Sequence, residues 1–342
     1  MDMRIGILDS DQSGFPNLCL MKLSAFHKSK GDTVTWYTTH DQFDRVYVSK
    51  IFTESPDLAS AVEDAGNATE VLRGGSGYDL KNKLPYGIEH CTPDYSLYPD
   101  CNFAIGFLTR GCPRKNHAQS CGGFCITPDK DGCIPHKTAD LSEFWTGQKE
   151  IYLLDQNLLA CKEKFDLLKQ LADSKARVNF AGGLDARYMT DEVIEAMRDI
   201  RVKDWHFAWD DPHEDLRPAF ERIAKSGLCK THPGVYVLTN FWSTHEEDLY
   251  RVNTLRGLGF EPYVMIYDKQ KFVDRKGHLL PGVWDRYTDE QIYHFRICQI
   301  MQRWTANRIL WKSAKTLDEY QNYQNFINGG WIRQRNKGRS TK

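Results

Sequence analysis

The sequence lacks the features that mark several classes of protein. No apolar run approaches the roughly 20 residues that a membrane-spanning helix needs, and the start, Met1-Asp2-Met3-Arg4, has neither the charged nor the apolar region of a signal peptide. Lys and Arg total 45 and Asp and Glu 46, so the net charge of −1 argues against a globally basic nucleic-acid-binding chain. Internal repeats and low-complexity tracts are also missing. We therefore expect a cytoplasmic protein without membrane association.

What the sequence has is length and cysteine. The chain contains 342 residues, of which 41% are hydrophobic, and this is enough for two domains or one large barrel. Ten residues are cysteines, and four of them lie within the 22 positions from 112 to 133. In a reducing compartment, such a cluster indicates metal binding or catalysis before it indicates disulfides.

The first hundred residues have the pattern of a small α/β domain. We predict a strand over Arg4–Leu8, a helix over Phe15–Lys30, a strand over Thr33–Tyr37 and a third strand over Asp44–Phe52, followed by the turn Gly74–Gly77. Strand, helix and strand at this spacing favour a parallel sheet. Prolines between 81 and 101 mark a connector.

A second pattern begins at residue 102, with six predicted strands. They span Phe103–Thr109, Glu150–Leu154, Arg177–Ala181, Asp204–Ala208, Gly234–Thr239 and Pro262–Tyr267. Helices are predicted between most of them, over Leu158–Leu171, Asp191–Met197, Pro218–Ala224 and Leu249–Leu258. Six strand–helix units predict part of a barrel, two short of the closed eight-unit form. A helix over Asp289–Asn307 follows, and the basic tail 333–342 is expected to be a disordered, solvated segment.

The cysteine cluster follows the first barrel strand, in Gly106-Phe-Leu-Thr-Arg-Gly-Cys112-Pro-Arg and Cys121-Gly-Gly-Phe-Cys125-Ile. Catalytic residues of βα barrels lie at the carboxyl ends of the strands. Three thiolates on one loop can bind three irons of a cubane and leave the fourth open. The segment resembles the cluster loop of radical S-adenosylmethionine (radical SAM) enzymes, which have strand-Thr-Arg-Gly-Cys-Pro-Arg and an aromatic residue before the last cysteine. The usual spacing between the cysteines is three and two residues, whereas this chain has eight and three.

The resemblance implies a [4Fe-4S] cluster on Cys112, Cys121 and Cys125, with S-adenosylmethionine bound at the open iron. It implies reductive cleavage to a 5′-deoxyadenosyl radical, which acts on a substrate that the sequence does not reveal. An electron donor such as flavodoxin or ferredoxin is also implied. Cys133 is the other candidate for the third ligand, because the expanded spacing leaves the middle position open.

A zinc site is the main alternative for the same segment. Cys112, Cys121, Cys125 and Cys133 could close a tetrahedral structural zinc, although only the pair 121/125 has the spacing that zinc sites prefer. This alternative describes a zinc-stabilised, non-catalytic α/β protein, with nucleic acid as a partner through the basic tail. A third hypothesis keeps the cluster and assigns methyl or methylthio transfer.

Polar residues follow several of the predicted strands and are candidates for binding the cofactor. They are Asp155, Asn157, Asp185, Arg187, Asp210 and Asn240. Gly183-Leu-Asp185-Ala-Arg187 is similar to the methylthiotransferase-like branch of the family, in which Arg187 would bind the cofactor carboxylate. The alternatives are an ordinary turn or helix N-cap at Asn157 and a surface ion pair between Asp185 and Arg187.

The first domain resembles a degenerate cobalamin-binding domain. Asp9-x-Asp11-x-x-Gly14 is similar to Asp-x-His-x-x-Gly, with Asp11 in place of the cobalt-binding histidine, and Gly74-Gly-Ser-Gly77 is similar to a second turn of that family. Bound cobalamin is possible on this resemblance, but it would have no histidine ligand.

The predicted fold is therefore α/β: a partial (β/α)6 barrel of radical SAM type, preceded by a small Rossmann-like, cobalamin-binding-like domain. The predicted boundaries are 1–100 for the first domain, 101–284 for the barrel, 285–332 for a helical extension and 333–342 for the tail.

Overall fold

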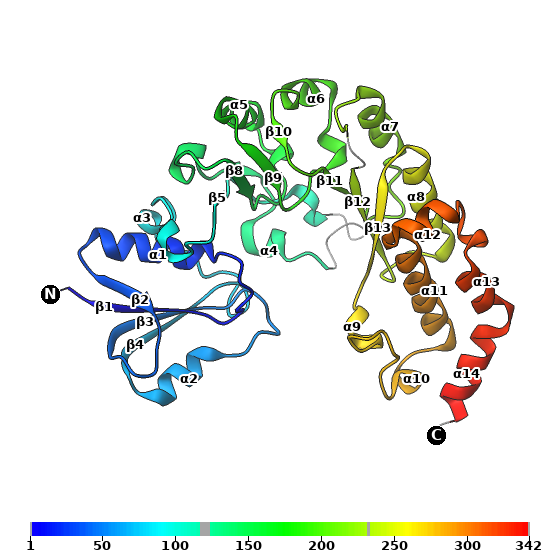
Figure 1. Cartoon of the computed structure of the whole chain (residues 1–342), viewed down its shortest axis with the longest axis horizontal. Coiled ribbons are helices and arrows are strands. Elements are labelled where there is room, and N and C mark those ends of the chain that lie inside the picture. The colour runs from blue at the N-terminus through cyan, green and yellow to red at the C-terminus, as the bar shows by residue number, and fades with distance from the viewer. Residues whose placement is uncertain (1, 117–123, 231–232, 341–342) are drawn as a thin grey trace. The chain divides into compact units, whose positions relative to one another are not determined.

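The computed structural model describes residues 2–116, 124–230 and 233–340 (Figure 1). The chain forms two compact units. Of the described residues, unit 1 contains 2–116, 124–182 and 199–203, and unit 2 contains 183–198, 204–230 and 233–340. This division does not follow the four predicted domains, whose boundaries stay a prediction.

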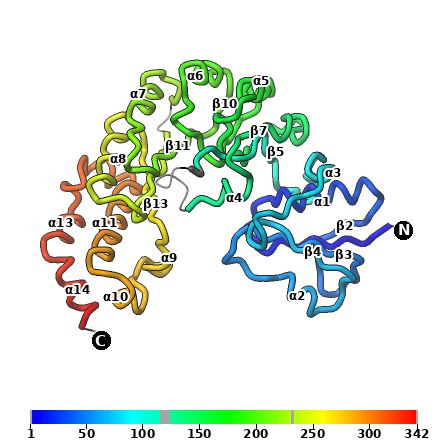
Figure 2. The backbone as a smooth tube through the Cα atoms, turned by 180° about the vertical axis from the view of Figure 1, so that it is seen from behind, coloured from blue at the N-terminus to red at the C-terminus, as the bar shows by residue number. Residues whose placement is uncertain are grey.

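The N-terminal part of unit 1 is a four-stranded parallel sheet in the order β2-β1-β3-β4. Its strands are β1 (Arg4–Asp9), β2 (Thr33–Trp36), β3 (Phe43–Ser49) and β4 (Ala68–Gly74). Helices α1 (Leu18–Ser29) and α2 (Leu58–Ala65) cover opposite faces, as both views show (Figures 1 and 2). Ile7 packs under α1, whereas Val46 and Val48 pack under α2, because alternate side chains of a strand face opposite sides. The predicted parallel sheet is confirmed.

A second parallel sheet in unit 1 has the order β10-β9-β8-β5. Its strands are β5 (Phe103–Gly106), β8 (Glu150–Leu153), β9 (Arg177–Phe180) and β10 (Arg201–Val202). Around it lie α4 (Thr127–Asp131), α5 (Lys164–Ser174) and the antiparallel pair β6 (Thr109–Arg110) and β7 (His136–Lys137), whereas the short helix α3 (Tyr86–Glu89) packs through Ile88 against α1.

Two predictions for this region need correction. The strand expected over 103–109 ends at Gly106, because Leu108 and Thr109 donate hydrogen bonds to the side chain of Asp155 and Thr109 pairs with β7. The helix expected over 158–171 is interrupted, because Cys161 has an extended backbone with ψ 146°. Helix α5 therefore begins only at Lys164.

Unit 2 contains a third parallel sheet in the order β11-β12-β13. The strands are β11 (His206–Ala208), β12 (Gly234–Thr239) and β13 (Glu261–Ile266). The helices of this region are α6 (Asp191–Met197), α7 (Arg217–Ser226) and α8 (His245–Gly257). The predicted N-cap Thr190 accepts a hydrogen bond from Val193 N. Thr244 and Glu247 form a capping box that starts α8.

The rest of unit 2 is helical. It contains α9 (Lys269–Phe272), α10 (Val283–Arg286), α11 (Asp289–Ala306), α12 (Arg308–Ser313), α13 (Gln321–Asn325) and α14 (Trp331–Ser340). The expectation of a disordered tail is corrected for residues 333–340, which belong to α14 (Figure 1). Arg339 makes an ion pair with Asp289 and lies over the ring of Trp284, and these contacts hold the basic segment against the unit.

The coarse fold class is confirmed: the protein is a mixed α/β structure built on parallel sheets. No helix in the described ranges has the length and apolar character needed to cross a membrane.

Candidate functional site

Cys112 lies in a closely packed turn of unit 1. Gly111 has a φ of +90°, and a side chain there would meet the carbonyl oxygen of Ile134 at 2.7 Å. The backbone N–H of Cys112 donates to the carbonyl of Gly132 at 3.0 Å, and the cysteine is 8% exposed. The Gly–Cys order is therefore required by the fold, because only glycine tolerates both this φ and this close approach.

The side chain of Asn157 contacts the sulfur of Cys112. Its Nδ2 lies 3.6 Å from the Sγ and donates to it, and both residues are buried. Asn157 occupies the N-cap position of the turn Leu158–Ala160, but its side chain makes no capping hydrogen bond. The side-chain amide of Asn157 therefore contacts the Cys112 sulfur and does not cap the turn. Donors of this kind stabilise a sulfur that carries negative charge.

Asp155 anchors the segment that leads into Cys112. Its Oδ2 accepts from Leu108 N at 3.1 Å, and its Oδ1 accepts from the N and the Oγ1 of Thr109, each at 2.6 Å. Burial raises the pKa of this carboxyl to about 6, against the opposing effect of these hydrogen bonds. The close packing extends to Gly182, where a side chain would meet the carbonyl oxygen of Asp155 at 2.2 Å.

Asp131, at the end of α4, is a site residue that sequence reasoning missed. Its Oδ1 lies 3.3 Å from Arg110 Nη1 and 2.9 Å from Lys83 Nζ, and its Oδ2 accepts from Gln156 Nε2 at 3.2 Å. Arg110 also pairs with Glu89 at 3.0 Å. This network ties α4 to Arg110, two residues before Cys112, and to Gln156, which lies between Asp155 and Asn157. No motif marks Asp131 in the sequence, since its partners come together only in the fold.

The other predicted cluster ligands are described less fully. Cys125 is half-buried and lies two residues before α4, and Cys133 is also half-buried and adjoins Gly132, the backbone partner of Cys112. Cys121 lies outside the described residues. The choice between Cys121 and Cys133 as third ligand stays a prediction.

The remaining candidate cofactor-binding residues lie in unit 2. Two of them, Arg187 and Asp185, belong to an ion-pair network. Arg187 pairs with Asp185 (Nε to Oδ1) and with Glu214 (Nη1 to Oε2), both at 2.8 Å. Asp185 is also the N-cap of its turn, accepting from Arg187 N. The ion pair that one alternative predicted is present, but it is partly buried and not at the surface as that alternative expected. Whether Arg187 also binds a ligand carboxylate stays a prediction.

Asp210 and Asn240 follow β11 and β12 at their carboxyl ends. Burial raises the pKa of Asp210 to about 6, although the charges of Arg251 and Arg187 oppose this effect. Asn240 has a left-handed backbone with φ 60°, and its Nδ2 donates to the carbonyl of Tyr267 at 3.1 Å. Both residues therefore lie at the strand ends that the prediction gave them.

In the N-terminal sheet, Asp11 takes the place of the expected cobalt ligand. Its Oδ2 accepts from Ile51 N at 2.7 Å, and its Oδ1 accepts from Phe52 N at 3.1 Å and Ser55 Oγ at 2.6 Å. The carboxylate therefore holds the loop after β3. Gly75 has a φ of +95° and approaches the Lys50 carbonyl so closely that a side chain there would meet it at 2.3 Å. Cobalamin binding stays a prediction.

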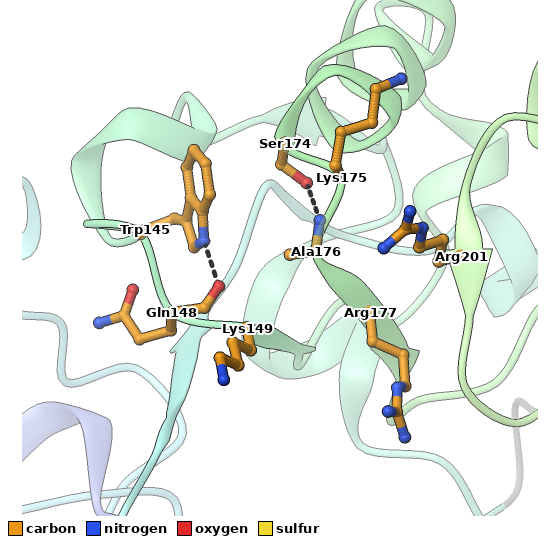
Figure 3. A pocket seen from close by; sticks show the side chains of 9 residues that line it. Trp145, Gln148, Lys149, Ser174, Lys175, Ala176, Arg177 and Arg201 are labelled. Carbon is orange, nitrogen blue, oxygen red and sulfur yellow. Dashed lines mark hydrogen bonds between the residues drawn. The ribbon is translucent and has the colours of Figure 1, made fainter.

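A basic cavity of about 370 Å³ lies at the opposite, amino-terminal ends of β8, β9 and β10 (Figure 3). Its cationic lining residues are Lys149, Lys175, Arg177 and Arg201. Trp145 forms one wall and donates to the carbonyl of Gln148 at 2.9 Å. Because Asp155 and Cys112 follow the carboxyl ends of strands in the same sheet, this cavity is separate from the predicted cluster loop.

The predicted residues thus form two groups, one in each unit. Cys112, Asp155 and Asn157 lie together in unit 1, and Asp185, Arg187 and Asp210 interact in unit 2. The chain matches no protein-family model, and no curated protein matches it by sequence.

Proposed function

We propose that the protein is a radical SAM enzyme whose [4Fe-4S] cluster is bound by Cys112, Cys121 and Cys125. The observation that carries the proposal is the contact of the Asn157 amide with the Cys112 sulfur. A buried sulfur with an N–H donor at 3.6 Å suits a thiolate ligand, because a neutral core thiol needs no such donor. The pattern Thr109-Arg110-Gly111-Cys112-Pro113 adds the resemblance to the cluster loop.

The residues around Cys112 fit this group in their chemistry. Cys112 and Cys125 are thiol donors, and Asp155 and Asp131 hold the two ends of the loop that carries them. When bound, the cluster and S-adenosylmethionine would supply the electron transfer and the 5′-deoxyadenosyl radical that start the reaction. In this proposal Asn157 orients the Cys112 thiolate, and Asp155 keeps Leu108 and Thr109 in place.

The candidate residues at the strand ends of unit 2 are the ones proposed to bind the cofactor. We propose that Arg187, Asp185, Asp210 and Asn240 contribute to S-adenosylmethionine binding, with Glu214 keeping the guanidinium of Arg187 oriented. A partial (β/α)6 barrel of radical SAM type is part of the proposal. It is supported by the sequential parallel order of β8, β9 and β10 and of β11, β12 and β13, and by the parallel bridge between Leu184 and Phe207. We also propose that the protein works in the cytoplasm. A flavodoxin or ferredoxin would be its electron donor.

Anaerobic reconstitution with iron and sulfide tests the proposal. We expect a brown protein that binds iron and sulfide and cleaves S-adenosylmethionine when a reductant is added. Cys125→Ala should abolish the cluster, whereas Cys229→Ala, which removes a cysteine of unit 2, should leave the iron content unchanged. A colourless protein that carries zinc on the 112–133 segment and takes up no iron would refute the proposal and favour the zinc alternative.

A further inference from the structure

Three potential metal ligands meet between helices α8 and α11 of unit 2, far along the chain from the cysteine loop. Asp248 and Cys298 are fully buried, and the side chain of His294 is 21% exposed. Their ligand atoms all lie within 4.8 Å of one another, and this is the one such group of His, Cys, Asp or Glu side chains in the described part of the chain.

The three atoms lie at distances that suit a coordination site, and the Cys298 thiol, when protonated, donates a hydrogen bond to Asp248 Oδ2. Cys298 Sγ lies 3.6 Å from His294 Nε2 and 3.7 Å from Asp248 Oδ2, and His294 Nε2 lies 3.7 Å from the same Oδ2. The histidine–carboxylate distance is too long for a hydrogen bond. Ligand atoms around a tetrahedral zinc are about 3.3–3.6 Å apart, given Zn–S of about 2.3 Å and Zn–N or Zn–O of about 2.0–2.2 Å. The observed triangle thus matches one face of such a tetrahedron to within a few tenths of an ångström.

Asp248 is oriented by a second, fully buried side chain. Its other oxygen, Oδ1, accepts from Arg251 Nη2 at 2.5 Å, so Oδ2 is the oxygen that faces Cys298 and His294. Arg251 is itself fixed by donating to the carbonyls of Trp209 at 2.7 Å and Leu238 at 2.9 Å. Outer partners of this kind orient metal-binding carboxylates. The guanidinium charge opposes a cation, and the Asp248 carboxylate together with a Cys298 thiolate offsets it.

The same three residues do not have the geometry of a nucleophilic catalytic triad. In such a triad one histidine nitrogen faces the nucleophile and the other faces the carboxylate. Here Nε2 of His294 faces both Cys298 and Asp248. Burial also raises the pKa of the Cys298 thiol well above its usual value, which disfavours a free thiolate.

A second histidine adjoins the group. His245 precedes Asp248 by one turn in α8, its Nδ1 is buried and finds no hydrogen-bond partner in the described ranges, and its Nε2 lies 3.4 Å from Tyr323 Oη. Residues three apart in a helix lie on the same face, so His245 lies on the same side of α8 as Asp248.

We propose that Asp248, His294 and Cys298 form a binding site for a zinc-type divalent cation that locks α8 to α11, with His245 or a water molecule as the fourth ligand. Mixed nitrogen, sulfur and oxygen donors in a tetrahedral arrangement favour Zn²⁺, and Co²⁺ is its spectroscopic substitute. In this proposal the metal ion enters beside the ring of His294, which is partly exposed. This site is independent of the proposed iron–sulfur cluster.

The test uses the full chain with Cys112, Cys121, Cys125 and Cys133 changed to serine, so that neither a cluster nor a loop-bound zinc contributes. We expect about one equivalent of Zn²⁺ by elemental analysis, a rise in Tm on adding Zn²⁺, and a thiolate-to-cobalt charge-transfer band on adding Co²⁺. Adding Cys298→Ser should abolish the band. His294→Gln should weaken Zn²⁺ binding at least tenfold, because even the loss of an outer partner costs about 10–100-fold.

His278→Gln is the matched control, since it removes an exposed histidine of unit 2 and should leave metal binding unchanged. If Cys298→Ser does not fold, His294→Gln and the cobalt spectrum of the parent decide. A folded parent that shows no cobalt–thiolate band, or Zn²⁺ binding that is unaffected by His294→Gln, would overturn the proposal. Neither result bears on the cluster, which the parent lacks by design.

Discussion

Replacing Asp155 with asparagine should change how the stability of the protein depends on pH. The carboxyl ionises near 3.8 in an unfolded chain, and burial raises its pKa to about 6 in the folded protein. Between these values the folded state binds more protons, so this group's contribution to stability falls as the pH rises and is constant above about pH 6. The difference in pKa corresponds to a loss of about 3 kcal/mol.

The hydrogen bonds of Asp155 determine how much stability the asparagine variant loses at low pH. An asparagine side chain can still accept from the N and Oγ1 of Thr109, but its NH2 group would face Leu108 N, which now donates to Oδ2. Leaving that buried N–H without an acceptor costs about 1–3 kcal/mol. The Asp155→Asn variant should therefore be less stable than the wild type by about 1–3 kcal/mol near pH 4, and this deficit should vanish or reverse near pH 7.5.

Urea denaturation at the two pH values measures these free energies of unfolding, and hydrogen exchange of peptides covering residues 103–112 adds a local measurement. Other buried carboxyls titrate in the same window, so the informative quantity is the difference between variant and wild type. Asp166→Asn, which changes an exposed carboxyl of unit 1, is the control and should shift nothing. A stability difference between Asp155→Asn and the wild type that is the same at both pH values would refute the reasoning.

Three further predictions concern other parts of the chain. Arg251→Met should lower the free energy of unfolding by about 3–5 kcal/mol in urea denaturation, because it leaves the buried carboxylate of Asp248 without its cation. Gly75→Ala should lower the Tm by several degrees, since Lys50 O lies 2.3 Å from the added carbon, whereas Gly87→Ala, at an open position, should not. Asn157→Ala should shift the reduction potential of a reconstituted cluster while retaining its iron, as protein-film voltammetry and iron analysis would show, and an unchanged potential would contradict the assigned role.

Local sequence predicted most of the longer strands, although it missed β4 and the short strands β7 and β10. Gly234–Thr239 was predicted and observed with the same bounds, because a β-branched and apolar run is typical of a buried parallel strand. The helix Asp191–Met197 was predicted by its cap and acidic first turn. These features depend on neighbours along the chain, and a single sequence contains that information.

The errors arose where a distant side chain decides the local structure. The strand after Phe103 is shortened by Asp155, which lies about 50 positions away, and the basic tail is held against unit 2 by the ion pair of Arg339 with Asp289. The role of Asp131 and the contact between Asn157 and Cys112 have the same origin. Asn157 was predicted as a site residue, but its partner was not, since a side chain's orientation depends on tertiary packing.

The antiparallel pair β6–β7 has a consequence for the unusual spacing of the cysteines. Thr109 and Arg110 pair with Lys137 and His136, and Cys112 N bonds to Gly132 O, so the two ends of the segment from Cys112 to Gly132 are held together. The entropy cost of closing a loop grows only with the logarithm of its length, and doubling the length costs about 0.6 kcal/mol. Once the two ends are held together, additional residues between them therefore change the free energy of folding little. The β6–β7 pairing and the bond from Cys112 to Gly132, and not the number of residues between them, therefore fix where this segment starts and ends.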